Sequence, residues 1–185
     1  MFTLVIKDKL TVMARWPRIP ILIIACILMS LLFTACKSRQ DIILEYHDKA
    51  SSIADEYLEI ILGIVNEEIQ ALDNSVTLND LKFKANWLRE MELSVQELKH
   101  DLRLLEPPDE LQEFHNKALF SFDRAVIGIT QLVTVYEGVI HSPTTPLLWE
   151  DLKIGLDTIG VSIDIWQTAL LEMNEIIANT DGSKD

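Results

Sequence analysis

Apolar residues recur every three and four positions along four long segments of the chain, which is typical of helices that bury one stripe. The pattern predicts helices over residues 41–72, 78–106, 108–140 and 146–179. In chain order, the predicted core stripes are Ile43, Tyr46, Ala50, Ile53, Tyr57, Ile60, Ile64, Ile69 and Leu72; Leu81, Ala85, Leu88, Met91, Val95, Leu98, Leu102 and Leu105; Leu111, Phe114, Ala118, Phe122, Ala125, Ile129, Leu132, Tyr136 and Val139; and Trp149, Leu152, Leu156, Ile159, Ile163, Trp166, Leu170, Met173 and Ile177.

Similar helix lengths and short connections predict an all-α fold over residues 41–180, an antiparallel up-down-up-down four-helix bundle with coiled-coil-like seams. Ser38 and Thr77 each precede an acidic residue by three positions, as in a capping box, and Pro108 and Pro146 suit first-turn positions. Charged residues interrupt the stripes in two places. Glu67 breaks the first stripe, and Lys84 breaks the register of the second.

The chain begins differently from the rest. Lys7, Lys9, Arg15 and Arg18 precede an almost uninterrupted apolar run over residues 19–33, which is typical of an export signal. A membrane-spanning helix needs roughly 20 apolar residues, so the shorter run favours cleavage. We therefore expect residues 1–35 to be a signal peptide, with Met13 as an alternative start.

The end of this run, Leu32-Phe33-Thr34-Ala35-Cys36, resembles the lipobox of bacterial lipoproteins, with Phe33 standing where that family usually has Leu. The resemblance implies that Cys36 is acylated, becomes the mature N-terminus and holds the protein on the outer side of a membrane. The alternative is an uncleaved single N-terminal transmembrane helix. The stretch Leu105-Glu106-Pro107-Pro108 is similar to segments of uncharacterised bacterial helical lipoproteins, and the mature domain resembles no characterised family.

A tether of residues 36–40 spans roughly 15 Å even when extended, so the bundle is expected to lie close to the bilayer. In that arrangement the start of the first helix, the turn at Pro107 and Pro108, and the C-terminus face the membrane. The turns over residues 73–79 and 141–146 then point away from it.

The mature chain is strongly acidic. Four of the 16 basic residues and one of the 29 acidic residues precede Cys36, which leaves 12 against 28 and a net charge of −16. Nucleic acid is therefore excluded as a partner, because binding to a polyanion depends on Lys and Arg. The expected partners are the membrane, through lipidated Cys36, and a protein of the cell envelope.

Candidate chemistry is sparse. The Glu-x-x-His spacing of di-iron bundles occurs once, at Glu97 and His100, and the comparable place in the third helix has Gln112 before His115. These residues are weak metal candidates, and both histidines are expected at the edge of the bundle. No catalytic grouping and no cofactor are predicted, so the chain is interpreted as a non-enzyme.

Two classes of function remain. The favoured class is a non-enzymatic interaction or scaffold module, and the second is a small-molecule sensor or carrier with an apolar cavity between helices. A metal-binding bundle is a remote third. Glycine inside a helix is destabilising relative to alanine, so the helical glycines are expected to allow either close helix approach or an interior that admits a ligand. Five glycines lie inside predicted helices: Gly63, Gly128, Gly138, Gly155 and Gly160.

Overall fold

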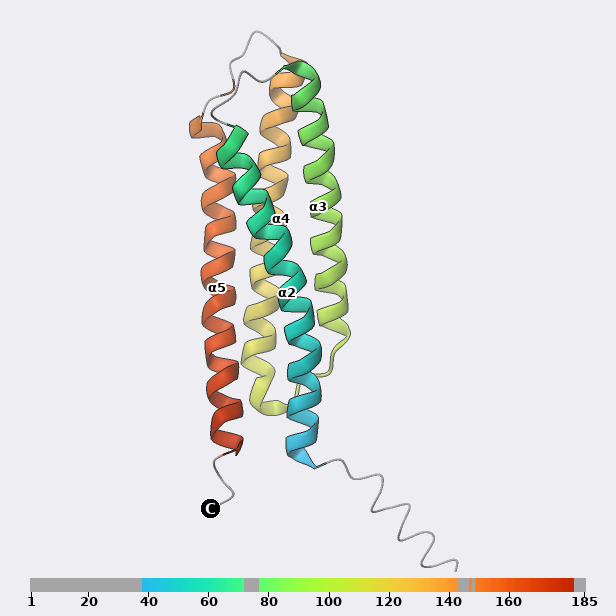
Figure 1. The fold of residues 1–185 in the computed structure, drawn as a ribbon, viewed down its shortest axis with the longest axis vertical. Coiled ribbons are helices and arrows are strands. Elements are labelled where there is room, and N and C mark those ends of the chain that lie inside the picture. The colour runs from blue at the N-terminus through green and yellow to red at the C-terminus, as the bar shows by residue number, and fades with distance from the viewer. Residues whose placement is uncertain (1–37, 72–76, 143–146, 148, 182–185) are drawn as a thin grey trace, which may run out of the picture. The chain divides into compact units, whose positions relative to one another are not determined.

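The chain folds as a bundle of four long helices in a computed structural model, which describes residues 38–71, 77–142, 147 and 149–181. The helices are α2 (Arg39–Ala71), α3 (Leu78–Leu104), α4 (Gln112–His141) and α5 (Trp149–Asp181), and the short 3-10 helix η1 (Asp109–Leu111) precedes α4. They run antiparallel in chain order around the bundle (Figure 1). The predicted all-α, up-down-up-down four-helix architecture is confirmed, and the described residues contain no strand.

The two ends of the bundle differ in what they contain. The start of α2, η1 and the end of α5 lie at one end, and the end of α2 and the start of α3 lie at the other (Figure 1). An ion pair between Arg39 and Glu110 joins α2 to η1 at the first end. At the second end, Thr77 and Asp80 form the predicted capping box, in which each side chain bonds to the other's backbone N–H.

In the turn between α3 and α4, the structure differs from the predicted end of the second helix at Glu106 and from the predicted start of the third helix at Pro108. Helix α3 ends at Leu104, because Leu105 is extended, with ψ at 132°. Pro108 is also extended, with ψ at 154°, and caps the 3-10 turn η1 instead of opening an α-helix. The Pro107-Pro108 pair prevents helical backbone before it, since a proline disfavours the α conformation of the preceding residue. Pro146 and the predicted end at Leu72 lie outside the described residues.

The buried stripe of α2 does not follow the predicted seven-residue repeat. Ala54 and Ile61 are buried, whereas the predicted Ile53 and Ile60 are only partly buried and Ile69 is 54% exposed. The sequence of buried positions is Ile43, Tyr46, Ala50, Ala54, Tyr57, Ile61, Ile64 and Glu68. These positions span 25 residues in seven turns, about 3.6 residues per turn, because one extra four-residue step between Ala50 and Ala54 interrupts the heptad.

Helix α5 buries smaller residues than predicted. Leu152, Ile159, Trp166 and Met173 are buried as expected, but the positions between them are filled by Gly155, Ser162 and Ala169. The predicted Leu156, Ile163 and Leu170 are only partly buried against the core.

Two of the five helical glycines account for this small-residue face. A Cβ on Gly128 of α4 would lie 2.8 Å from the carbonyl oxygen of Gly155, and one on Gly155 would lie 2.9 Å from that of Gly128. The backbones of α4 and α5 therefore approach closely at this crossing, which confirms close helix approach as the reason for these two residues. Gly63, Gly138 and Gly160 have no such neighbour within 4 Å, so packing does not explain them.

Candidate binding groove and the buried polar contacts beneath it

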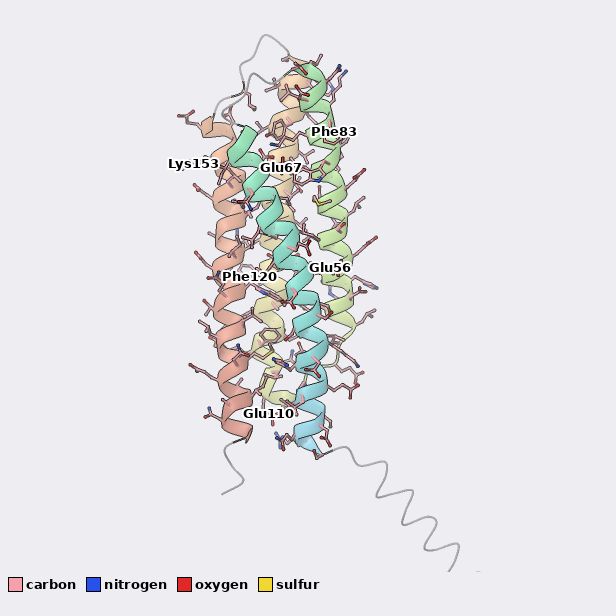
Figure 2. All side chains as sticks on the ribbon, viewed as in Figure 1. Glu56, Glu67, Phe83, Glu110, Phe120 and Lys153 are labelled. Atoms are coloured by element: carbon pink, nitrogen blue, oxygen red, sulfur yellow. The ribbon has the colours of Figure 1, made fainter. Side chains whose placement is uncertain are left out.

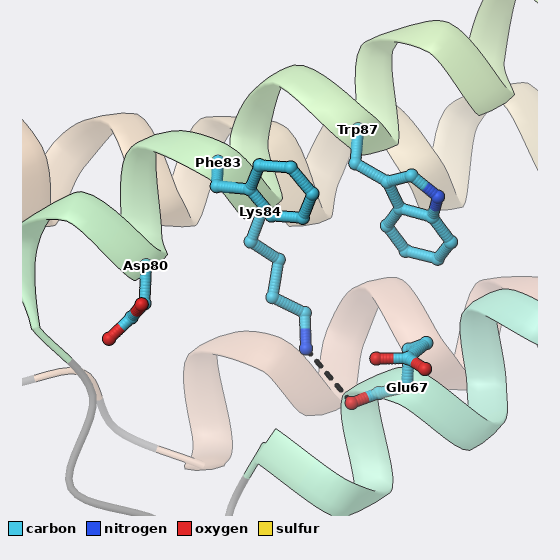
Figure 3. Close-up of a pocket in the computed structure, with 5 residues that line it drawn as sticks. All are labelled: Glu67, Asp80, Phe83, Lys84 and Trp87. Atoms are coloured by element: carbon cyan, nitrogen blue, oxygen red, sulfur yellow. Dashed lines mark hydrogen bonds between the residues drawn. The ribbon is translucent and has the colours of Figure 1, made fainter.

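An open groove of about 360 Å³ lies between α2 and α3, at the end of the bundle where α2 ends and α3 begins. Its lining residues are Glu67 of α2 and Asp80, Phe83, Lys84 and Trp87 of α3. The α3 residues are spaced three, four and seven positions after Asp80, so they share one face of the helix. Figure 3 shows the side chains of Trp87 and Lys84 directed toward the helix that carries Glu67, and the Phe83 ring closer to α3.

The aromatic wall of the groove is unusually accessible. The side chain of Phe83 is 75% exposed, the largest fraction among the exposed large apolar residues described, and Trp87 is partly buried against the core. Figure 2 places Phe83 near this end of the bundle. Exposed apolar surface rimmed by polar groups is a common feature of interaction sites.

Two carboxylates lie along the groove. Asp80 accepts hydrogen bonds from the backbone N–H and the hydroxyl of Thr77, at 2.9 and 2.6 Å. These bonds hold the pKa of Asp80 below its usual range, so the group stays ionised. Glu67 contributes the second carboxylate, and its backbone carbonyl accepts a hydrogen bond of 2.9 Å from the Lys84 ammonium.

Lys84 is directed inward rather than toward the mouth of the groove. Its side chain is 14% exposed, and its Nζ lies 3.3 Å from Oε1 of Glu68 and 5.9 Å from the centre of the Tyr136 ring. The 3.3 Å contact is an ion pair without hydrogen-bond geometry, because Glu68 Oε1 has no hydrogen-bond donor among the described residues. The positive charge of Lys84 is therefore compensated below the groove.

Glu68 is a fully buried carboxylate at the end of the α2 stripe. The hydroxyl of Tyr136, on α4, donates a hydrogen bond to its Oε2. Burial raises the pKa of Glu68, and the hydrogen bond from Tyr136 and the charge of Lys84 oppose that rise. Burial also raises the pKa of Tyr136, with the Glu68 charge acting in the same direction, so the phenol remains protonated.

Among the residues that the structure describes, the contact between Glu68 and Tyr136 is one of three buried polar links between α2 and α4, which lie diagonally across the bundle (Figure 1). In the middle, Tyr57 forms hydrogen bonds of 3.0 Å with Ser121 and 3.1 Å with Ser162. The three α2 residues are Tyr46, Tyr57 and Glu68, spaced eleven positions apart. These three residues thus place a polar group in the core at about every third turn of α2.

The third link is at the opposite end of the bundle, where the Tyr46 hydroxyl lies 2.8 Å from Nδ1 of His115. His115 is 6% exposed, so its predicted position at the edge of the bundle is wrong. Its neighbour Phe114 lies on the predicted stripe, and the buried face of α4 is wide enough to include both residues. Burial lowers the pKa of His115, which is therefore held neutral.

The weak metal candidates lie away from these contacts. Glu97 and His100 are exposed on α3 and line an open depression with Asp101. Within the part of the chain that the structure describes, no three His, Cys, Asp or Glu side chains form a group that could hold a metal ion. Cys36, the predicted lipid-attachment residue, lies outside the described residues.

Sequence reasoning missed Glu68 and the exposed aromatic wall. The signal for the buried ion pair was present as two interruptions, since Glu67 and Lys84 break stripes on neighbouring antiparallel helices near the turn that joins them. Opposite charges at such facing positions can pair. The pattern did not reveal that Glu68, rather than Glu67, faces inward.

The segment Asp109–His141 is the one helix in the described residues that is long and apolar enough to cross a membrane by length and composition alone. Its buried residues, among them Phe122, Ile129 and Leu132, form much of the bundle core. Comparison of the chain with protein-family models, curated proteins and solved structures found no match.

Proposed function

We propose that the chain is a non-enzymatic interaction module, held on the outer side of a membrane by a lipid on Cys36, that binds an envelope protein through the groove between α2 and α3. The observation that carries the proposal is the accessible aromatic wall, in which Phe83 is 75% exposed beside Trp87. A monomeric bundle gains nothing in its own core from an aromatic side chain in this position.

The position of the groove supports the same proposal. It lies at the end of the bundle opposite the start of α2. With a short tether before α2, a lipid on Cys36 holds that start near the bilayer and leaves the groove on the side facing away. A partner in the extracytoplasmic space can then reach it.

The sensor or carrier alternative requires a ligand cavity between the helices. Three cavities lined by described residues are open at the surface: the groove at Phe83, a second beside Tyr46 and Leu105, and the depression at His100. None of these observations favours an interior ligand, so the interaction module is the function that the geometry supports best.

Site-specific photo-cross-linking on intact cells tests the proposal. A benzophenone amino acid in place of Phe83 is expected to capture one protein reproducibly. The matched control is the same amino acid in place of Phe120, a 48% exposed residue that Figure 2 shows at a different level of the bundle. Identical adduct patterns from both positions, or no protein adduct from position 83, would reject the groove as the binding site.

A further inference from the structure

The groove carries a net negative charge although it contains a lysine. The ammonium group of Lys84 pairs with the buried Glu68 at 3.3 Å, so these two charges compensate each other. The carboxylates of Glu67 and Asp80 remain along the lining. Asp80 is fixed by its two bonds to Thr77, which leaves its position predetermined when a ligand arrives.

The aromatic side chains add a second attraction for the same kind of group. The faces of Trp and Phe rings attract cations, with an exposed contact contributing a few-fold in affinity. Phe83 and Trp87 are spaced four residues apart on α3 and line the groove together with both carboxylates. Aromatic rings and carboxylates in one groove favour a positively charged group carried on an apolar stem.

The shape of the groove indicates the source of that group. Small-molecule sites enclose most of their ligand, whereas this groove is open along one side. An open groove accepts a side chain that projects from a larger partner. The acidic mature chain, with a net charge of −16 from its 12 basic and 28 acidic residues, also repels an acidic partner and attracts a basic one.

We infer that the groove binds a basic segment of the partner protein, and that an Arg or Lys side chain of that segment lies against Phe83 and Trp87 with its charge beside Glu67 and Asp80. The inference rests on the proposed function and gives the chemistry of its partner. It requires no covalent step and no metal ion.

The test uses the mature lipidated chain in phosphatidylcholine nanodiscs, labelled with ¹⁵N and observed through the indole N–H signals of its three tryptophans, Trp87, Trp149 and Trp166. The Trp87 signal is assigned with the variant Trp87→Phe. The probe is the peptide acetyl-Leu-Arg-Leu-amide, and the matched control peptide replaces Arg with citrulline, which has almost the same shape and no charge. Trp166, which is fully buried, provides an internal reference.

The Arg peptide is expected to shift the Trp87 signal in a saturable way and to leave the Trp166 signal in place. The citrulline peptide should bind about tenfold more weakly, because it lacks both the cation–π contact and the charge attraction. Glu67→Gln should weaken binding of the Arg peptide several-fold and Phe83→Ala at least as much, whereas Phe120→Ala should leave it unchanged. Raising the salt concentration from about 50 to about 500 mM should also weaken it.

Equal binding of the Arg and citrulline peptides would overturn the inference. A saturable response to phenethylammonium combined with no response to the Arg peptide would also overturn it and indicate a small-molecule site. Failure of the proposed function gives a different result, since cross-linking from position 83 then captures no protein. A captured partner together with an unmoved Trp87 signal contradicts the cation chemistry and leaves the interaction module standing.

Discussion

Replacing Lys84 with Met should lower the free energy of unfolding at pH 7 by about 3–5 kcal/mol, because the change leaves a buried carboxylate without its cation. Glu68 is 0% exposed, and the Lys84 ammonium lies 3.3 Å from it. At an effective dielectric constant of about 20, that separation corresponds to an attraction of about 5 kcal/mol. Desolvation of the two ions offsets most of this attraction, so the intact pair contributes little while loss of one partner is costly.

The size of the loss should depend on pH in a defined direction. Burial raises the pKa of Glu68 above its ordinary 4.5. Because the folded-state pKa is raised, the contribution of protonated Glu68 to stability is fully present below pH 4.5. That contribution is lost as the pH rises through the folded-state pKa. Without Lys84 the pKa of Glu68 rises further. The deficit of Lys84→Met should therefore shrink as the pH is lowered toward 4.5, where Glu68 is protonated and needs no cation.

Urea unfolding followed by far-UV circular dichroism measures these differences. The chain from Ser38 onward is suitable, because Arg39–Asp185 forms a compact unit of its own. The control is Lys82→Met, which removes an exposed lysine of the same helix and should change the free energy by less than about 0.5 kcal/mol. In the background of Glu68→Gln, Lys84→Met should cost at least about 2 kcal/mol less than in the wild type. Equal losses in the two backgrounds, or a loss independent of pH, would show that the contact between Lys84 and Glu68 does not cause the loss.

Three further predictions concern the core. Gly128→Ala should destabilise the bundle by about 1–3 kcal/mol, because its Cβ would lie 2.8 Å from a backbone oxygen of α5. Gly63→Ala should instead stabilise it by about 0.5–1 kcal/mol, since nothing lies within 4 Å of its Cβ. Thermal unfolding of the two variants checks both. Burial lowers the pKa of His115, so its contribution to stability is present above pH 6.5 and is lost as the pH falls through the folded-state pKa. The difference in unfolding free energy between wild type and His115→Gln should therefore decline as the pH is lowered over that range. A constant difference would contradict a buried, neutral His115. Tyr57→Phe should cost about 0.5–1.5 kcal/mol in urea unfolding, and a cost near zero would show that the central hydroxyl network adds nothing.

The fold was predictable because each helix carries a clear apolar stripe and the connections between helices are short. The details of the stripes were less predictable where packing depends on size rather than hydrophobicity. In α5 the pattern selected Leu156 and Ile163, while the structure buries Gly155 and Ser162. Close approach to α4 requires small residues at these positions, and the partner of a helix is not visible in its own periodicity.

The candidate site was less predictable than the fold. The interruption at Lys84 was visible, but the sequence pattern did not distinguish its partner Glu68 from the adjacent Glu67. The buried position of Glu68 follows from the extra four-residue step between Ala50 and Ala54 of α2, which a strict heptad does not contain. Phe83 lies outside the predicted stripe, between Leu81 and Ala85, so its exposure was implied; the groove beside it was not, because it depends on how α2 packs against α3.

The lipid anchor on Cys36 is tested most directly by mass spectrometry of the N-terminal peptide of the native protein, isolated from membranes. This peptide is expected to begin at Cys36 and to carry two or three acyl chains. An intact N-terminal segment that includes residues 19–33 would contradict this expectation, because the protein would then be held by a single transmembrane helix and not by a lipid.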